Sequence, residues 1–229
     1  MLVSFGVASI PEREAALQVT IASIYWQVDR VNVYLNNYSR VPRFLRRKKI
    51  TVFRSKDFGD LGDAGKFFRI EEGFNLHGDD DLIYPEGYVN YLRSKIEQYE
   101  RRAVITLHGR NLYQVPIKSY YKDYEELFRC LDDVEEDRFC QIAGTGVLAY
   151  HTDTIKPNVR DFPCPNMGDI WFSLLAQKQK VPLLVANHKK SWLKTSPTNG
   201  KTIYQKHHRA DQLQTSVINS FNDWKIYRL

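Results

Sequence analysis

The first 35 residues of the chain predict a strand, a helix and a second strand in succession. Residues 2–8 form one apolar run, and residues 31–35 form another. Between the two runs, apolar side chains recur at helical spacing at Leu17, Ile21, Ile24, Tyr25 and Val28. Strands joined by a helix run parallel, and parallel sheets bind ligands at the carboxyl ends of their strands. The pattern therefore predicts an α/β fold with a site bordered by Ala8 and Ser9.

The start of the first helix is also predicted by the sequence. Ser9 and Glu12 have the spacing of a capping box, in which Ser9 would be the N-cap residue. We therefore expect the helix to begin directly after Ser9.

The rest of the chain continues the alternation of strands and helices. Strands are predicted at residues 50–53, 103–107 and 181–186, and in 141–150, where Gly-Thr-Gly interrupts the strand. Helices are predicted over residues 64–74, after Pro85, and from Asn166. Residues 113–137, rich in tyrosine and acid, are predicted to be an insertion with short helices that forms a lid over one side of the site. The expected fold is a mixed, mostly parallel sheet flanked by helices.

Length and composition favour one domain over residues 1–229. With 43% hydrophobic residues, the chain is able to bury a full core. No run approaches the roughly 20 apolar residues of a membrane span, and the N-terminus lacks the basic region of a signal peptide. The three cysteines are scattered, without paired metal spacing, which is typical of free thiols in a reducing compartment. We therefore expect a cytoplasmic protein.

The formal net charge of +6 is unevenly distributed. Residues 40–56 hold eight basic side chains and no acid, and residues 189–209 are basic again. Such patches attract an anionic membrane surface or nucleic acid, although a basic run is more often a solvated face. Charge alone thus leaves peripheral membrane contact and nucleic-acid contact as alternatives.

Three successive aspartates, Asp79, Asp80 and Asp81, form the most distinctive chemical motif. Adjacent carboxylates repel one another, so they are best tolerated in water or around a cation. At the end of a strand, the pleat would direct Asp79 and Asp81 to one side and Asp80 to the other. Mg²⁺ and Mn²⁺ bind such carboxylates and complete their shell with water or phosphate. The alternative is a solvated acidic turn before Pro85.

A glycine-rich loop precedes the triplet. Its backbone is able to approach a ligand closely, and Lys66 would meet a phosphate at the start of the next helix. Turn chemistry alone would also explain the loop, and its spacing is not that of a Walker motif.

In the second half of the chain, three features are candidates for ligand contacts. His108 follows a predicted strand, Gly144-Thr145-Gly146 permits a close backbone approach to a sugar, and Asp169 lies in the first turn of a helix. A hydrogen-bonded structural histidine and a capping aspartate are the structural alternatives.

Taken in order, these motifs resemble the family 2-like glycosyltransferases of the GT-A fold, especially bacterial members that act in capsule or surface-polysaccharide synthesis. The matching segments are Ala-Ser-Ile-Pro, Gly-Asp-Ala-Gly-Lys-Phe-Phe, Asp-Asp-Asp-Leu-Ile-Tyr-Pro-Glu-Gly-Tyr-Val, Gly-Thr-Gly and Gly-Asp-Ile-Trp-Phe. The resemblance implies that residues 1–107 bind a nucleotide-diphosphate sugar and that residues 108–229 bind a saccharide or lipid-linked acceptor. A position at the inner face of the membrane would suit such an enzyme.

The resemblance also implies roles for individual residues. Asp79 and Asp81 match positions that hold Mn²⁺ or Mg²⁺, and His188 could match a third ligand, with His207 or His208 as alternatives. The implied nucleotide-sugar contacts are Ala8, Ser9, Asp63, Lys66, Asp79 and Asp80. The implied acceptor or sugar contacts are His108, Gly144, Thr145 and Gly146. Asp169 matches the carboxylate that takes the acceptor proton in inverting members.

Other functions remain open at this stage. A nucleotidyltransferase shares a similar sheet, but it usually has a glycine- and arginine-rich loop after the first strand, and residues 8–11 lack one. A nucleic-acid-binding module would use the basic residues 40–56 without needing the aspartates. A glycosyltransferase acting on hydroxylated DNA bases would use both features.

Overall fold

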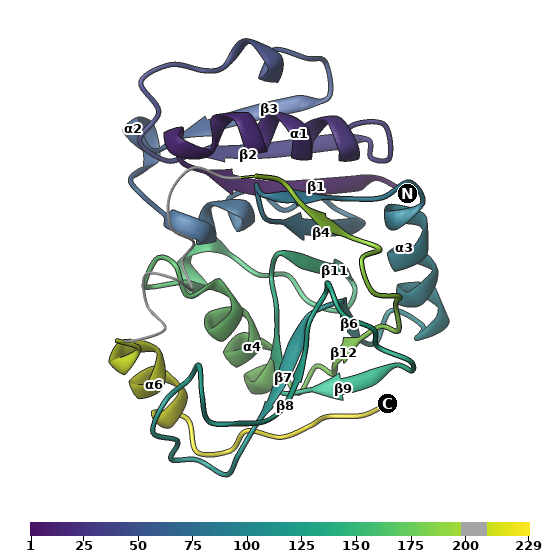
Figure 1. The fold of residues 1–229 in the computed structure, drawn as a ribbon, viewed down its shortest axis with the longest axis vertical. Coiled ribbons are helices and arrows are strands. Elements are labelled where there is room, and N and C mark those ends of the chain that lie inside the picture. Colours follow the sequence, from purple (N-terminus) through teal and green to yellow (C-terminus); the bar gives the residue numbers. More distant parts are fainter. Residues whose placement is uncertain (198–209) are drawn as a thin grey trace.

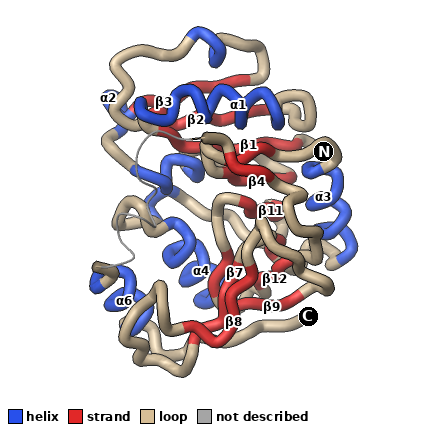
Figure 2. The backbone as a smooth tube through the Cα atoms, in the orientation of Figure 1, coloured by secondary structure: helices blue, strands red, loops and turns tan. Residues whose placement is uncertain are grey.

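The protein is described by a computed structural model that covers residues 1–197 and 210–229. Eight strands form its central sheet, in the order β3-β2-β1-β4-β11-β6-β12-β9 (Figures 1 and 2). The strands are β1 (Val3–Ser9), β2 (Arg30–Leu35), β3 (Ile50–Arg54), β4 (Phe74–Gly78), β6 (Val104–Thr106), β9 (Arg138–Cys140), β11 (Val147–His151) and β12 (Leu183–Val185).

Most strands of this sheet run in one direction. β1 pairs in parallel with β2 and β4, β2 with β3, and β6 with β12. β11 is antiparallel to β4 and β6, and β9 is antiparallel to β12. The predicted mixed, mostly parallel sheet is therefore confirmed.

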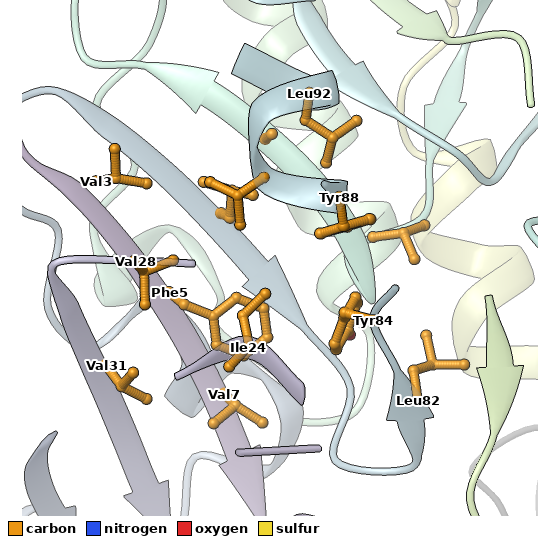
Figure 3. Close-up of a cluster of buried hydrophobic side chains, with 14 of the residues drawn as sticks. Val3, Phe5, Val7, Ile24, Val28, Val31, Leu82, Tyr84, Tyr88 and Leu92 are labelled. Atoms are coloured by element: carbon orange, nitrogen blue, oxygen red, sulfur yellow. The ribbon is translucent and has the colours of Figure 1, made fainter. Parts of the chain in front are cut away.

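Helices cover both faces of the sheet. Successive side chains of a strand point to opposite faces of the sheet, so they pack into different hydrophobic cores. Ala149 of β11 packs in the core that includes α1 (Glu14–Ile24) and α3 (Tyr88–Gln98). Its neighbour Tyr150 joins the core with α4 (Gly168–Gln179). Figure 3 shows the first core, where Phe5 of β1 lies among side chains from several elements. The sheet is thus the middle layer of three.

The first helix begins later than the sequence predicts. Ser9 remains the last residue of β1, paired with Leu35, and its hydroxyl lies 3.1 Å from that of Tyr38. A 3₁₀ turn, η1 (Pro11–Arg13), follows without a side-chain cap, and α1 starts at Glu14. The predicted capping box is wrong because the Ser9 side chain bonds elsewhere.

A smaller antiparallel sheet lies beside the second half of the main one. It consists of β10 (Ile142–Ala143), β7 (Gly109–Leu112) and β8 (Tyr124–Phe128). The prediction of short helices over residues 113–137 is therefore wrong, since β8 pairs with β7 there. The predicted break of a strand by Gly-Thr-Gly is confirmed, because residues 144–146 separate β10 from β11.

The remaining elements are short. They are η2 (Arg43–Leu45), α2 (Ser55–Phe58), η3 (Gly62–Phe67), β5 (Leu82–Ile83), η4 (Val159–Asp161), β13 (Lys194–Thr195) and α6 (Gln212–Asn219). The helix predicted over residues 64–74 is in fact the 3₁₀ helix η3, which ends seven residues before β4 begins. Within residues 1–197 and 210–229, no helix has the length and apolarity needed to cross a membrane.

Candidate active site

A cavity of about 700 Å³ opens at the carboxyl ends of β1 and β4. It has the size of an ordinary small-molecule site. The α4 N-terminus and residues of the small sheet complete its wall. Of the residues predicted from the sequence, the cavity wall includes Ala8, Ser9, Asp63, Lys66, Asp79, Asp80, Asp81, His108, Gly144, Thr145, Gly146 and Asp169. The structure brings these side chains together, and their roles stay predictions.

Lys66 and Asp79 form an ion pair in the cavity wall. Lys66 Nζ donates to Asp79 Oδ1 at 2.6 Å. Lys66 is 3% exposed, whereas the Asp79 side chain is 47% exposed and faces the cavity. Burial lowers the pKa of Lys66, but Asp79 and Asp63 outweigh this effect and raise it. Burial raises the pKa of Asp79, and the Lys66 ammonium reverses this shift and lowers it. Both groups are therefore charged at neutral pH.

The other two aspartates share a different cation. The triplet lies in the turn after β4, which ends at Gly78, so the strand pleat does not orient its side chains. Arg13 Nη1 donates to Asp80 Oδ1 at 2.8 Å and lies 3.1 Å from Asp81 Oδ2. Asp80 is buried. Burial and the nearby Asp79 carboxylate raise the pKa of Asp81 to about 6. Arg13 thus neutralises only part of the negative charge here.

The Tyr84 hydroxyl joins the aspartate turn to the Gly-Thr-Gly turn. It accepts a hydrogen bond from the Asp79 N–H at 2.9 Å and donates to the Gly146 carbonyl at 2.8 Å. Figure 3 places Tyr84 beyond the end of β5, close to Tyr88 of α3. A side chain at Gly146 would collide with the Asp79 carboxylate, and one at Gly144 would meet His108. The close approach predicted at this motif is therefore to protein side chains.

A Tyr84→Phe variant is expected to lower the free energy of unfolding by about 1–3 kcal/mol, because it leaves a buried N–H and a buried carbonyl without their partner. Urea denaturation measures this change. Tyr124→Phe is the matched control, since the Tyr124 ring contacts Arg110 but its hydroxyl makes no hydrogen bond in the part of the chain that the structure describes. Equal stability of the two variants would contradict the role given to the Tyr84 hydroxyl.

Asp63 has a free acceptor atom at the cavity wall. Its Oδ2 accepts the N–H of Gly168, the first residue of α4, at 2.8 Å. Its Oδ1 is buried and has no hydrogen-bond partner among the described residues. Burial raises the pKa of Asp63, and Lys66 and the Gly168 N–H oppose the shift. An unpaired buried acceptor is costly, so a donor group of a ligand would stabilise this atom.

Asp169 is held by one of its two carboxylate oxygens. Its Oδ1 accepts hydrogen bonds from the N–H and the hydroxyl of Thr145, both at 2.7 Å. No side chain or backbone group of the described residues bonds to its Oδ2. The prediction that Asp169 lies in the first turn of a helix is confirmed. One oxygen is thus fixed by Thr145, and the other is available to a ligand.

His108 also lies in the cavity wall. Burial lowers its pKa to about 4, while Asp169 opposes the shift and Arg110 adds to it. The imidazole is therefore neutral at pH 7.

The fold has distant counterparts among solved structures. Residues 1–349 of TarS from S. aureus give a TM-score of 0.48 at 12% identity, over 83% of this chain and 59% of that one. The galactosyltransferase LgtC, solved with donor and acceptor sugar analogues, gives 0.39 at 13% identity, over 77% of this chain and 66% of that one. A 4-diphosphocytidyl-2C-methyl-D-erythritol synthase from Anaerococcus prevotii gives a TM-score of 0.38 at 10% identity, over 76% of this chain and 77% of that one. At these values, none of them assigns a function to this chain.

Comparison of sequences adds nothing to these distant similarities. No protein-family model matches the chain, and no curated protein matches it. The chain spans 59% of the TarS fragment, so any activity of a whole relative is a proposal here.

The donor atoms at the cavity wall fit a hard divalent cation that completes its shell with ligand oxygens. Asp79 and Asp81 both line the cavity and repel each other, which a cation would relieve. No group of three or more His, Cys, Asp or Glu side chains in the described residues is arranged to hold a metal by itself. Diphosphate oxygens or water would therefore have to complete the shell.

The balance of charges around the aspartates also favours a bound divalent cation. Within the described residues, five carboxylates face two cations, namely Asp60, Asp63, Asp79, Asp80 and Asp81 against Lys66 and Arg13. A diphosphate entering this side would be repelled unless a divalent cation entered with it.

His188 is not placed with the aspartates. Its Nδ1 lies 2.8 Å from the Ala186 carbonyl and its Nε2 lies 3.3 Å from that of Arg129. It also lies outside the wall of the cavity. The prediction of His188 as a third metal ligand is therefore corrected, because its ring bonds to backbone in the structure. The alternatives His207 and His208 lie outside the described residues.

Two residues of the site were missed in the sequence. Arg13 follows Pro11 in η1, and its pairing with two aspartates depends on a contact 67 residues away in sequence. Tyr84 stands in the segment Leu-Ile-Tyr-Pro directly after the triplet. That position was a usable signal, whereas nothing local indicates the partners of Arg13.

Proposed function

We propose that the protein is a metal-dependent glycosyltransferase that moves a sugar from a nucleotide-diphosphate sugar to a hydroxyl acceptor. The proposal rests on one observation: a diphosphate-side cluster of Lys66, Asp79 and Asp81 shares a single cavity with Asp169, one of whose oxygens is unbonded within the described residues. The motif resemblance adds a surface polysaccharide as the acceptor class. Residues 1–107 would bind the donor and residues 108–229 the acceptor.

In the proposed reaction, the acceptor oxygen attacks the anomeric carbon in line with the departing diphosphate. The carbon–oxygen bond to the diphosphate breaks, and its electron pair leaves with the diphosphate. The acceptor proton passes to Asp169 Oδ2, since a hydroxyl with a high pKa needs a base at its point of attack. Single displacement inverts the anomeric configuration.

Negative charge develops on the leaving diphosphate, and Lys66 is a fixed cation that stabilises it in the transition state. A bound Mn²⁺ or Mg²⁺, held by Asp79 and Asp81, would act as a Lewis acid on the same oxygens. Thr145 keeps the Asp169 carboxylate oriented, because it donates two hydrogen bonds to the oxygen that does not react.

A thermal-shift screen of UDP, GDP, CDP and TDP sugars, each with and without Mn²⁺, tests the proposal. One nucleotide is expected to raise the melting temperature with Mn²⁺ present, because binding to the native state stabilises it. The charge balance predicts a much smaller shift in EDTA. If no nucleotide sugar shifts the transition under either condition, the assignment fails.

A second candidate acceptor is a hydroxylated base in DNA, which the basic segment favours. Arg43, Arg46, Arg47 and Lys48 are exposed, and no acidic side chain among the described residues pairs with them. They would hold a duplex or, for a saccharide enzyme, an anionic membrane face. Duplex binding whose affinity falls steeply with salt would favour the DNA acceptor.

A further inference from the structure

The acceptor side of the cavity has a charge opposite to that of the donor side. Arg110 on β7 and Arg129, just after β8, both line the cavity. Figure 1 shows β7 and β8 in the lower half of the view, whereas β1 and β4 lie in the upper half. Among the described residues, Asp169 is the acid in the wall on this side, and Arg129 is paired with Asp132 at 3.7 Å. Arg110 therefore remains as a cation that no carboxylate neutralises in this part of the chain.

Arg110 is a nearly buried cation without a counter-ion. It is 8% exposed, and no carboxylate pairs with it among the described residues. Its Nη1 donates to the Tyr120 carbonyl at 2.8 Å, the one side-chain hydrogen bond it makes within that part of the chain. A guanidinium offers five N–H donors, and burying a charge without a partner is costly. An anion in the cavity would offset this cost.

Tyrosine rings hold the guanidinium in a fixed position. Its Cζ lies 4.3 Å from the ring centre of Tyr120, 5.9 Å from that of Tyr121 and 5.8 Å from that of Tyr124. The Tyr120 ring is the nearest of the three and makes a cation–π contact with the guanidinium, whose remaining N–H groups are left for hydrogen bonding.

This cluster and the proposed base share one cavity, since Arg110, Tyr121 and Asp169 all line its wall. In agreement with this placement, burial raises the pKa of Tyr121 to about 12, and the negative charge of Asp169 adds to the increase. One acceptor molecule would therefore be able to place an anionic group at Arg110 and its reacting hydroxyl at Asp169.

We propose that Arg110 binds a negatively charged group of the acceptor saccharide, a carboxylate or a phosphate, and so selects anionic over neutral acceptors. This inference rests on the proposed glycosyl transfer and names its acceptor class. Arginine binds both anions through paired N–H groups. Arg129, with a side chain that is 56% exposed, also lines the cavity, but it lies 3.7 Å from the Asp132 carboxylate, so Arg110 is the cation that the inference uses.

Titration of methyl glucuronide and of methyl glucoside, followed by NMR or calorimetry, tests the inference. The wild-type protein is expected to bind the glucuronide at least about tenfold more tightly, as one charge-assisted pair allows. Arg110→Gln should reduce the glucuronide affinity to that of the glucoside, and Arg110→Lys should retain part of the preference. Arg160→Gln removes an exposed arginine outside the cavity wall and should change neither affinity.

The outcomes separate this inference from the proposed function. Equal affinities for the two sugars in the wild-type protein would overturn it, even if no variant folds. Weaker binding of nucleoside diphosphate with Mn²⁺ in Arg110→Gln would also overturn it, because it would assign Arg110 to the donor. The sugar titration needs no nucleotide, so a failure of every nucleotide to bind counts against the glycosyltransferase proposal alone.

Discussion

An Asp169→Asn variant is expected to lose about 10²- to 10⁴-fold in kcat, the usual contribution of a general base. The amide is isosteric and its oxygen still accepts the two hydrogen bonds from Thr145, so the helix start should be preserved. The variant loses the second carboxylate oxygen, Oδ2, which takes the acceptor proton in the proposed reaction. Release of nucleoside diphosphate in the presence of acceptor measures the effect.

The matched control is Asp223→Asn, which removes an exposed carboxylate that pairs with Lys225. Its kcat should equal that of the wild-type protein, and nucleotide affinity should be unchanged in both variants. A product with retained anomeric configuration, or an Asp169→Asn variant with a wild-type rate, would remove Asp169 from the proposed role.

An Asp81→Ala variant is expected to abolish turnover and the metal-dependent part of nucleotide binding. With Mn²⁺, nucleoside diphosphate should bind the variant no more tightly than in EDTA, because one of the two proposed ligands is gone. In EDTA alone, the variant should bind at least as tightly as the wild-type protein, because a repelling carboxylate has been removed. Calorimetry in the two buffers distinguishes these effects.

The fold of Asp81→Ala should be intact, since Arg13 keeps its shorter contact with Asp80 at 2.8 Å. Asp57→Ala is a suitable control, because Asp57 is exposed on α2 and lies outside the cavity wall. Full activity of Asp81→Ala would end the metal-dependent mechanism. Loss of nucleotide binding in EDTA would contradict the charge argument instead.

Much of the main sheet was predictable, because buried parallel strands are continuous apolar runs. The strands at residues 31–35, 50–53 and 181–186 have counterparts in β2, β3 and β12. The same reasoning failed for residues 113–137, where short helices were predicted. β8 is a partly exposed strand with acidic side chains, and its register comes from pairing with β7. Because β8 is fixed by pairing with another segment, its own sequence shows no hydrophobic periodicity that would predict it.

The site was predictable as a set of residue types, less so as a set of contacts. Asp79 and Lys66 were both singled out, but their ion pair depends on how η3 packs against β1 and β4. The pleat expected for the triplet did not apply, because β4 ends at Gly78 and the aspartates lie in a turn. Arg110 has no local signal at all. Its isolation from carboxylates is visible only once β7 and the three tyrosines are assembled.

The short strand β13 has a consequence for when the site is complete. Lys194 and Thr195 pair with β5, and the N–H of Ser196 donates to the Asp81 carbonyl at 2.7 Å. A nascent chain in which these residues are still inside the ribosome lacks this outer support of the aspartate turn. The proposed donor binding should therefore arise only after Ser196 has emerged, although the aspartates themselves are translated well before it.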